Sequence, residues 1–574
     1  MRIISSLFFF FITLQIHGQN ITTLFESSGG KQTPTYHEVI QWWRKLDAIS
    51  PNIKMQEMGA TDAGYPLHLV LISGDRDFNI ASLKKKNRNI IFVLNGIHPG
   101  EPDGIDASML LARDIQAGKY KLPSNVVIAL IPVYNIGGAL NRSAFYRVDQ
   151  NGPEEFGFRG NSQNLDLNRD FIKVDSKEAL SFTGIFRMLD PDIFVDNHVS
   201  NGADYQHVMT LITSQHNKLG GAMGLYLNKT FEPGLYDLMK KKGWDLVPYV
   251  NHFGETPDKG WTEFWDSPRY SSGYATLWNT FAFVPETHML KPYDQRVYST
   301  RDLMKSFIEF TGQNGPKITQ LRREAKELVR TQTQFPLKWK LDTTQSTSIT
   351  FKGYTAGRKE SQVSGLMRLW YDKTKPYEKQ VPYYNTYIDT FSVSKPKAYL
   401  IPQGWWRVIE RLVANGVQMQ KLKKDTTIDV EAYRITNYQA SQRPFEGHRP
   451  NSNVQVSSFM KQVAFRQGDY LIPMNQSANR FIIETLEPQG EDSYFTWNFF
   501  DAILGQKEGF SDYVFEETAA NLLKQNVELR NKLEQRKLSD SAFRKSAQVQ
   551  LNFIYQNSPY YEPAHMLYPV YRLK

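Results

Sequence analysis

The chain contains no cysteine among its 574 residues. This absence excludes disulfide bonds, cysteine-ligated zinc, iron–sulfur clusters, a thiol nucleophile and a lipoprotein anchor. Any bound metal ion must therefore be held by histidine, aspartate or glutamate. The sequence also lacks the patterns G-x-S-x-G and H-E-x-x-H. A serine-hydrolase nucleophile elbow and the common zincin helix are therefore both unsupported.

The length exceeds that of one ordinary domain and predicts two or three domains. Hydrophobic residues make up 41% and charged residues 22% of the chain, which excludes a fibrous, collagenous or largely disordered protein. The formal net charge is +9. A basic chain is one feature of nucleic-acid-binding proteins, but no motif that mixes aromatic and basic residues accompanies the charge. We therefore predict no nucleic-acid partner.

The N-terminus has the pattern of a signal peptide. Arg2 precedes a continuous apolar run at residues 7–14, and the small residue Gly18 follows as a cleavage point. The run is too short to span a bilayer, which needs about 20 apolar residues. We predict a signal peptide at residues 1–18, export to the periplasm or the medium, and no transmembrane anchor, because no other stretch is long enough.

Residues 19–335 predict a catalytic domain of the α/β class. Short apolar runs that read as buried strands alternate with helical patterns, and Ser176 is positioned as a helix N-cap. The predicted strands lie at 90–94, 126–131, 192–196 and 281–284, and the predicted helices at 105–115 and 176–189. Continuous apolar strands separated by helices indicate a mixed, mostly parallel sheet with helices on both faces. Ligands bind such sheets at the carboxyl ends of the strands.

Residues 336–574 predict an accessory α/β domain of unknown role. Residues 343–352 are rich in Thr and Ser and read as β structure, and residues 398–419 read as a β-α-β unit. Residues 515–537 read as one charged amphipathic helix. We find no internal repeat.

The first candidate metal ligands are His98 and Glu101 in the sequence His-Pro-Gly-Glu. They follow the predicted strand 90–94, so both side chains can turn toward one ion. The spacing alone is weakly specific, because His252 and Glu255 repeat it.

Polar residues further along the chain favour the pair His98 and Glu101 over the pair His252 and Glu255. Asp166, Asn168 and Arg169 form a D-x-N-R sequence, His198 follows a predicted strand in Asp-Asn-His, and Glu286 ends another strand. Two ligands from one loop and one remote ligand leave an open coordination position for water, as catalytic zinc requires.

These motifs, in this order, resemble the zinc carboxypeptidase family, the funnelin metallocarboxypeptidases, over roughly residues 35–310. The resemblance implies a carboxypeptidase-like fold and one Zn²⁺ held by His98, Glu101 and His198. It implies that Asp166 orients the first histidine, a relay that fixes the tautomer and raises ligand basicity. It also implies that Glu286 moves a proton from water to the leaving amine.

The resemblance assigns substrate-binding roles as well. Asn168 and Arg169 resemble the pair that grips a terminal carboxylate, for which the planar arginine fork is suited. Tyr270 resembles the mobile tyrosine over the site. Arg159 is the favoured carbonyl-polarising arginine, and Arg147 is the alternative.

The sequence also departs from the pancreatic enzymes. Gly100 stands where they usually have arginine, which is closer to the cytosolic carboxypeptidase and deacylase-like branches. Asp170 follows the arginine where many relatives have asparagine, and His288 lies near Glu286. Two nearby acids, Glu263 and Asp266, rival Glu286, but neither ends a convincing strand.

We therefore predict an exported zinc metallocarboxypeptidase, a protease that hydrolyses peptide bonds near a free terminal carboxylate. The departures leave two alternatives open. One is a zinc-dependent deacylase or amidohydrolase that acts on N-acyl amino acids or cell-wall peptides. The other is a non-catalytic binding protein on the same fold. The predicted partner is a peptide or acyl-amino-acid with a free carboxylate, and the sequence leaves the oligomeric state open.

Overall fold

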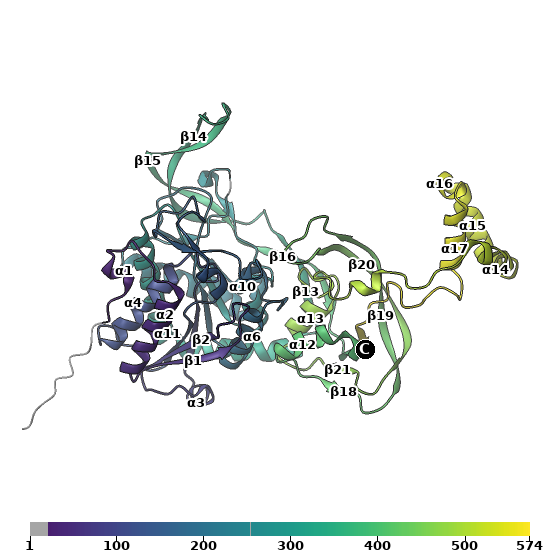
Figure 1. Ribbon diagram of the computed structural model, residues 1–574, viewed down its shortest axis with the longest axis horizontal. Coiled ribbons are helices and arrows are strands. Elements are labelled where there is room, and N and C mark those ends of the chain that lie inside the picture. Colours follow the sequence, from purple (N-terminus) through teal and green to yellow (C-terminus); the bar gives the residue numbers. More distant parts are fainter. Residues whose placement is uncertain (1–20, 253) are drawn as a thin grey trace, which may run out of the picture. The chain divides into compact units, whose positions relative to one another are not determined.

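The computed structural model describes residues 21–252 and 254–574, which form two compact units (Figure 1). The first unit holds the described residues up to Glu327 together with Lys340–Ile388, and the second holds Leu328–Trp339 and Asp389–Lys574. The predicted division at residue 335 placed 340–388 in the accessory domain, whereas their contacts lie with the first unit. The predicted signal peptide lies outside the described residues.

The first unit is built on a nine-stranded sheet with the order β1-β2-β4-β3-β7-β12-β9-β10, to which β8 adds beside β12. The strands are β1 Ile53–Gly59, β2 Leu67–Ser73, β3 Asn89–Leu94, β4 Val126–Ile131, β7 Ile193–Asp196, β8 His198–Val199, β9 Met209–Thr213, β10 Val247–Pro248 and β12 Phe281–Thr287. The central strands β4, β3, β7 and β12 are parallel, while β1, β2 and β9 pair antiparallel. This confirms the predicted mixed, mostly parallel sheet.

Helices surround this sheet. They are α1 Leu24–Ser27, α2 Tyr36–Ile49, α3 Ile80–Lys85, α4 Asp103–Gln116, α5 Ile136–Leu140, α6 Lys177–Leu189, α7 His216–Leu219, α8 Gly221–Tyr226, α9 Glu232–Lys241, α10 Ser271–Leu277 and α11 Tyr293–Thr331. Ser176 caps α6 as predicted, because its side chain accepts a hydrogen bond from the Ala179 amide. The long α11 was not predicted. None of the helices in the described ranges has the length and apolarity needed to cross a membrane.

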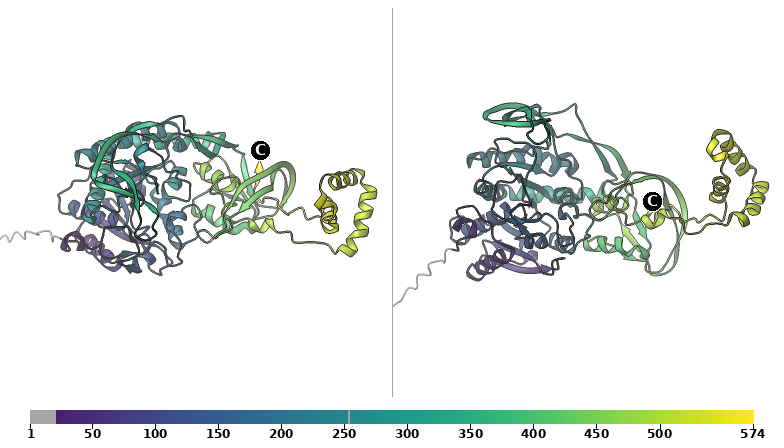
Figure 2. Two further views of the ribbon diagram at one scale, coloured as in Figure 1. Left: turned by 90° about the horizontal axis from the view of Figure 1, so that it is seen from above. Right: turned by 45° about the horizontal axis from the view of Figure 1, so that its top comes forward.

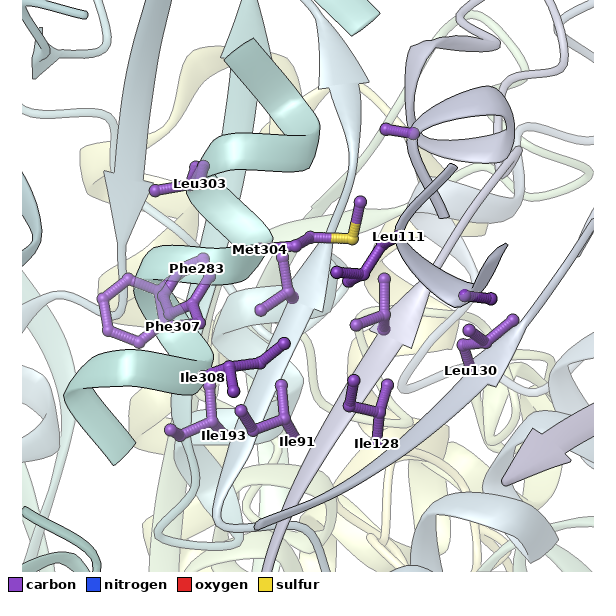
Figure 3. Packing of buried hydrophobic residues seen from close by; sticks show 14 of the residues in the cluster. Ile91, Leu111, Ile128, Leu130, Ile193, Phe283, Leu303, Met304, Phe307 and Ile308 are labelled. Carbon is purple, nitrogen blue, oxygen red and sulfur yellow. The ribbon is translucent and has the colours of Figure 1, made fainter. Parts of the chain in front are cut away.

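Both faces of the central strands are buried, which explains why their sequences are continuously apolar. On one face, α11 lays Met304, Phe307 and Ile308 over strand residues such as Ile91 and Ile128 (Figure 3). On the other face, Phe182 of α6 stacks on Phe92 of β3 with ring centroids 5.7 Å apart. The two helical layers hold the strand ends in fixed positions.

A long hairpin belongs to the first unit. Strands β14 Thr347–Glu360 and β15 Met367–Tyr384 pair antiparallel, and β11 Trp261–Thr262 joins β15 to complete a three-stranded sheet. Figure 2 shows the hairpin as an extended two-stranded ribbon. The base of the hairpin packs on a cluster that includes Trp261, Phe351 and Tyr383. The predicted β structure at 343–352 is therefore the start of this hairpin.

The second unit contains a six-stranded sheet with the order β18-β21-β17-β22-β19-β20. Its strands and the adjoining elements are β13 Gln334–Leu341, β16 Tyr387–Ser394, β17 Ala398–Ile401, α12 Trp406–Ala414, β18 Gln420–Lys421, β19 Thr426–Ala440, β20 Asn451–Phe465, β21 Tyr470–Pro473, α13 Asn479–Leu486 and β22 Tyr571–Leu573. The first strand and the helix of the predicted β-α-β unit are present as β17 and α12, whereas its second strand begins after the predicted range, as β18, and β21 lies between the two strands.

Four further helices of this unit pack on one another: α14 Asp512–Gln525, α15 Val527–Ser539, α16 Ser541–Arg544 and α17 Ala547–Gln556. The single helix predicted at 515–537 is wrong. The chain leaves the helical conformation at Asn526, whose side chain accepts a hydrogen bond from the Leu529 amide and so starts a second helix.

Candidate metal centre

The predicted metal ligands meet at the carboxyl ends of the central strands. His98 and Glu101 lie on the loop that leaves β3, and His198 lies on β8, just past the end of β7. On the adjacent strand β12, Glu286 is in register with His198. These strand ends bring the four side chains together from three distant segments of the chain.

The three candidate donors are buried and close. One ligand atom from each of His98, Glu101 and His198 lies within 4.8 Å of the others. Glu101 Oε1 is 3.3 Å from His98 Nδ1, and Glu101 Oε2 is 3.0 Å from His198 Nδ1. The set could therefore hold one metal ion.

Each histidine is held from behind by a carboxylate. His98 Nε2 is 2.9 Å from Asp166 Oδ1, and His198 Nε2 is 3.0 Å from Asp196 Oδ2. A carboxylate at Nε2 keeps the proton on that nitrogen and leaves the Nδ1 lone pair for a metal ion. Two imidazole nitrogens supported in this way, together with one carboxylate, are a donor set that fits zinc. The Asp196 contact was not predicted, although Asp196 stands two residues before His198.

The electrostatics of the donors match this arrangement. Burial lowers the pKa of His198, but the Asp196 and Glu101 carboxylates outweigh it and hold that pKa well above its usual value. Burial raises the pKa of Glu101, but the neighbouring Arg147 and His98 outweigh it and hold that pKa well below its usual range. Without a cation, the centre therefore favours an ionised Glu101 and a protonated His198, whose proton a metal ion must displace.

Arg147 explains the glycine in His-Pro-Gly-Glu. Its Nη1 donates to Glu101 Oε1 at 2.7 Å, and its Nη2 donates to the Val199 carbonyl at 3.3 Å. A Cβ atom on Gly100 would lie 2.8 Å from Arg147 Cδ and 3.0 Å from the Gly157 carbonyl oxygen. Glycine at this position therefore gives the arginine room to contact Glu101.

A cavity of about 230 Å³ opens beside the donors. Its described lining includes eight of the ten predicted site residues: His98, Glu101, Arg159, Asn168, Arg169, His198, Tyr270 and Glu286. Arg147 and Asp166 are not among the described lining residues. The lining also includes residues that were not predicted: Val199, Ser200, Asn201, Ile212, Tyr249, Asn251, Phe264, Ser271, Ser272 and Val284.

Arg159 lies between the donors and the cavity. Its Nε and Nη2 are each 2.9 Å from Asp166 Oδ2, and its Nη1 is 3.4 Å from Glu101 Oε1. The guanidinium therefore reaches both the cavity and the edge of the ligand set. Arg147 binds Glu101 from another side, so the geometry favours Arg159 over Arg147 for contact with a substrate.

Asn168, Arg169 and Tyr270 form another part of the wall. The Arg169 guanidinium carbon lies 4.6 Å from the centre of the Tyr270 ring. Arg169 Nη1 donates to the Asn168 carbonyl at 2.8 Å, and Asn168 Oδ1 accepts from the Ser271 amide at 3.4 Å. A cation and an amide thus line the cavity that the candidate ligands also line.

The carboxyl group of Glu286 has an unusually high pKa. Desolvation raises the pKa of its carboxyl to about 8, Glu101 acts in the same direction, and His198 opposes both. The rivals Glu263 and Asp266 are buried and are not among the described residues that line the cavity. His288 is engaged elsewhere, because its Nε2 lies 3.2 Å from Asp204 Oδ1. Glu286 is thus the carboxylate beside the donors that is available to a substrate.

Comparisons with known proteins agree with these observations. Residues 39–199 match the family model described as zinc carboxypeptidase. The chain is 21% identical over 503 residues to carboxypeptidase 2 of Trichophyton rubrum, covering 84% of this chain and 87% of that one. It is 20% identical over 437 residues to carboxypeptidase 2 of Trichophyton equinum, covering 73% and 75%.

Two solved structures are also similar. A metallo-carboxypeptidase from Pseudomonas aeruginosa, in complex with (2-guanidinoethylmercapto)succinic acid, matches with a TM-score of 0.37 and 14% identity, covering 49% of this chain and 69% of that one. Carboxypeptidase A from Helicoverpa armigera matches with a TM-score of 0.37 and 15% identity, covering 52% and 75%.

Proposed function

We propose that this member of the zinc carboxypeptidase family is exported and removes the terminal residue from peptides that end in a free carboxylate. The observation that carries the proposal is one cavity shared by the candidate donors His98, Glu101 and His198, the carboxylate of Glu286, and the cation Arg169. Export rests on the signal-peptide pattern at residues 1–18.

The donor set fits one zinc ion held by His98, Glu101 and His198, with Asp166 and Asp196 behind the two histidines. A zinc ion bound there supplies positive charge that polarises a carbonyl group and makes water more acidic. Arg147 keeps the Glu101 carboxylate ionised and in place through its hydrogen bond to Oε1. The chain itself supplies the remaining groups.

Glu286 is the proposed general base. Its ionised carboxylate takes a proton from the attacking water and then gives that proton to the leaving nitrogen. Arg159 donates to the oxygen of the scissile carbonyl as negative charge develops there, a contact that is worth a few kcal/mol in the transition state, roughly 2.7–4 in a measured case.

Arg169 and Asn168 are the proposed carboxylate-binding pair. The arginine fork can meet a terminal carboxylate with two parallel hydrogen bonds, and the Asn168 amide can add a further one. Tyr270, which lies against Arg169, would cover the bound residue. This arrangement selects substrates that end in a free carboxylate.

The size of the cavity favours one alternative. About 230 Å³ is small beside the roughly 300–1,000 Å³ of common ligand sites, and it suits a single amino acid. A zinc-dependent deacylase or amidohydrolase that acts on N-acyl amino acids or cell-wall peptides would use the same donors, base and carboxylate-binding pair.

A substrate panel distinguishes these activities. Zinc-loaded mature protein is incubated with a mixed peptide library and with a set of N-acyl amino acids, and the products are read by mass spectrometry with a chelator as control. We expect chelator-sensitive release of terminal residues from peptides. Turnover of the acyl amino acids alone would support the deacylase, and no turnover by zinc-containing protein would identify a binding protein.

A further inference from the structure

Among the described residues, the hairpin β14–β15 contacts the rest of the first unit from its base to its middle. Lys379 Nζ lies 3.4 Å from Asp258 Oδ2, and nearer the tip Lys373 Nζ lies 3.1 Å from Asp204 Oδ2, while the Tyr371 hydroxyl donates to the Glu255 carbonyl at 3.3 Å. The other end, residues 357–370, still lines a cavity with residues from 254–260 through Gly357, Arg358 and Leu369, and its turn projects from that unit (Figures 1 and 2). We call residues 357–370 the hairpin tip.

The hairpin tip exposes large apolar side chains. Val363 is 98% exposed, Leu366 71%, Met367 57% and Trp370 39%. Single apolar residues on a surface are ordinary, but several gathered at one end of an element mark an interaction site. A partner that fits these side chains has an apolar layer.

The same tip is positively charged. It contains Arg358, Lys359 and Arg368 against the one acid Glu360. Lys359 Nζ lies 5.0 Å from the centre of the Trp370 ring. Within the described chain, no carboxylate lies within ion-pair distance of the three cations, whereas cations nearer the base are paired. A partner that fits the tip is therefore anionic as well as apolar.

The turn at the tip satisfies its own backbone groups. Ser361 Oγ accepts hydrogen bonds from the Val363 and Ser364 amides, and the Ser361 amide donates to the Leu366 carbonyl at 2.9 Å. Ser364 Oγ accepts from the Leu366 amide. Moving this turn out of water costs little free energy, because few of its amides lack a hydrogen bond. A polar group is costly to bury only when it has no hydrogen-bond partner.

We propose that the hairpin tip binds an anionic lipid surface. Val363, Leu366 and Met367 enter the boundary between headgroups and acyl chains, where tryptophan is also favoured. The three cations contact the headgroup phosphates, as basic residues beside an anionic leaflet do. A second copy of the chain fits less well, because it brings the same positive charge to the contact and a net charge of +9.

Vesicle sedimentation with the full mature protein tests the charge requirement. We expect the protein to sediment with vesicles of phosphatidylcholine and phosphatidylglycerol, and at least about tenfold less with phosphatidylcholine alone, with binding weakened by salt. The double variant Leu366→Asp/Met367→Asp should lose this binding. The matched control Leu538→Asp, at a site 83% exposed in the second unit, should keep it.

The absence of cysteine allows a direct measurement of insertion. A dye that reports polarity is attached to Val363→Cys, or to the control Tyr513→Cys, which replaces a residue 90% exposed on α14. We expect a blue shift with anionic vesicles only for the dye at 363. No shift there, equal shifts at both sites, or equal binding to neutral vesicles would overturn the proposal. A dimer that Leu366→Asp/Met367→Asp converts to monomer, without vesicle binding, would overturn it in favour of a second copy.

Discussion

Asp166 is not among the described residues that line the cavity, yet it contacts the candidate ligand His98 from behind. Its Oδ1 accepts a hydrogen bond from His98 Nε2 at 2.9 Å, and its Oδ2 pairs with Arg159. Although burial raises the pKa of Asp166, the cations around it hold that pKa well below its usual range. The carboxylate is therefore ionised and sets which nitrogen of His98 is free.

We expect Asp166→Asn to weaken zinc binding by about 10- to 100-fold, because an amide oxygen is a weaker and uncharged acceptor for the histidine N–H. Competition with a chromophoric chelator measures the affinity. Asp149→Asn, at an exposed position, is the control and should bind zinc as the unchanged protein does. Equal affinities for all three proteins would show that Asp166 does not support the ligand.

Glu286 predicts the pH dependence of turnover. Desolvation raises its pKa to about 8 without a metal ion, and a nearby cation lowers the pKa of a carboxyl. A base must be ionised, so kcat/KM should rise tenfold per pH unit below this pKa and level off above it. The midpoint in zinc-loaded protein should lie below about 8.

A pH profile of kcat/KM, with zinc content measured at each pH, tests this. In Glu286→Gln we expect turnover to fall by roughly 10²- to 10⁴-fold, and the rise of kcat/KM with pH to disappear from the remaining activity. If the variant keeps the same rise, then a group other than Glu286 causes the pH dependence.

At the residue scale, the sequence predicted the groups to which we assign the proposed chemistry but few of the other residues that line the cavity. His98, Asp166 and Glu286 stand in short motifs at strand ends, so local spacing reveals them. Tyr249 and Phe264 line the cavity from loops whose paths depend on tertiary packing. No local pattern distinguishes them from ordinary aromatic residues.

At the scale of single elements, Asp170 stabilises the start of helix α6. Its carboxylate accepts from the Asp175 amide, the Ser176 amide and the Ser176 hydroxyl, each at 2.7–2.9 Å. The departure from the family pattern that we noted at this position therefore has a structural role in the loop that leads from Arg169 into α6.

Asp170→Ala should lower the free energy of unfolding by about 1–3 kcal/mol, because it leaves buried donors without an acceptor. Urea unfolding of the zinc-loaded protein measures the change. Asp149→Asn again serves as the control. A loss below a few tenths of a kcal/mol would contradict this role for Asp170.

Among the elements, most of those with a strong local signal were predicted and the others were not. The strands β3, β4 and β12 were located because both of their faces are buried and their sequences are continuously apolar. The strand β1 lies at the sheet edge, and its burial pattern is mostly exposed or intermediate. The strand β2 lies between β1 and β4 and is fully buried, but it was not predicted although its sequence is largely apolar. The helix break at Asn526 was missed because a charged amphipathic pattern continues across it.

At the scale of the whole molecule, the chain divides into two units, and all the candidate zinc ligands lie in the first. A ligand that binds only the folded state stabilises it by about 2.7 kcal/mol at a concentration of 100 times Kd. Zinc should therefore raise the unfolding temperature of the first unit and leave that of the second unchanged.

Calorimetry of metal-free and zinc-loaded protein, with unit-specific proteolysis to assign the transitions, measures these temperatures. A zinc-dependent shift confined to the second unit, or none at all, would contradict a metal centre at His98, Glu101 and His198.

The most direct test of the central claim compares pairs of peptides that differ only at the C-terminus. One member of each pair has a free carboxylate and the other an amide, and release of the terminal residue is followed with zinc-loaded protein, chelated protein and Glu286→Gln. We expect release from the free acids alone, only with zinc and only with Glu286 intact. Equal hydrolysis of the amides, or undiminished release by Glu286→Gln, would contradict the account.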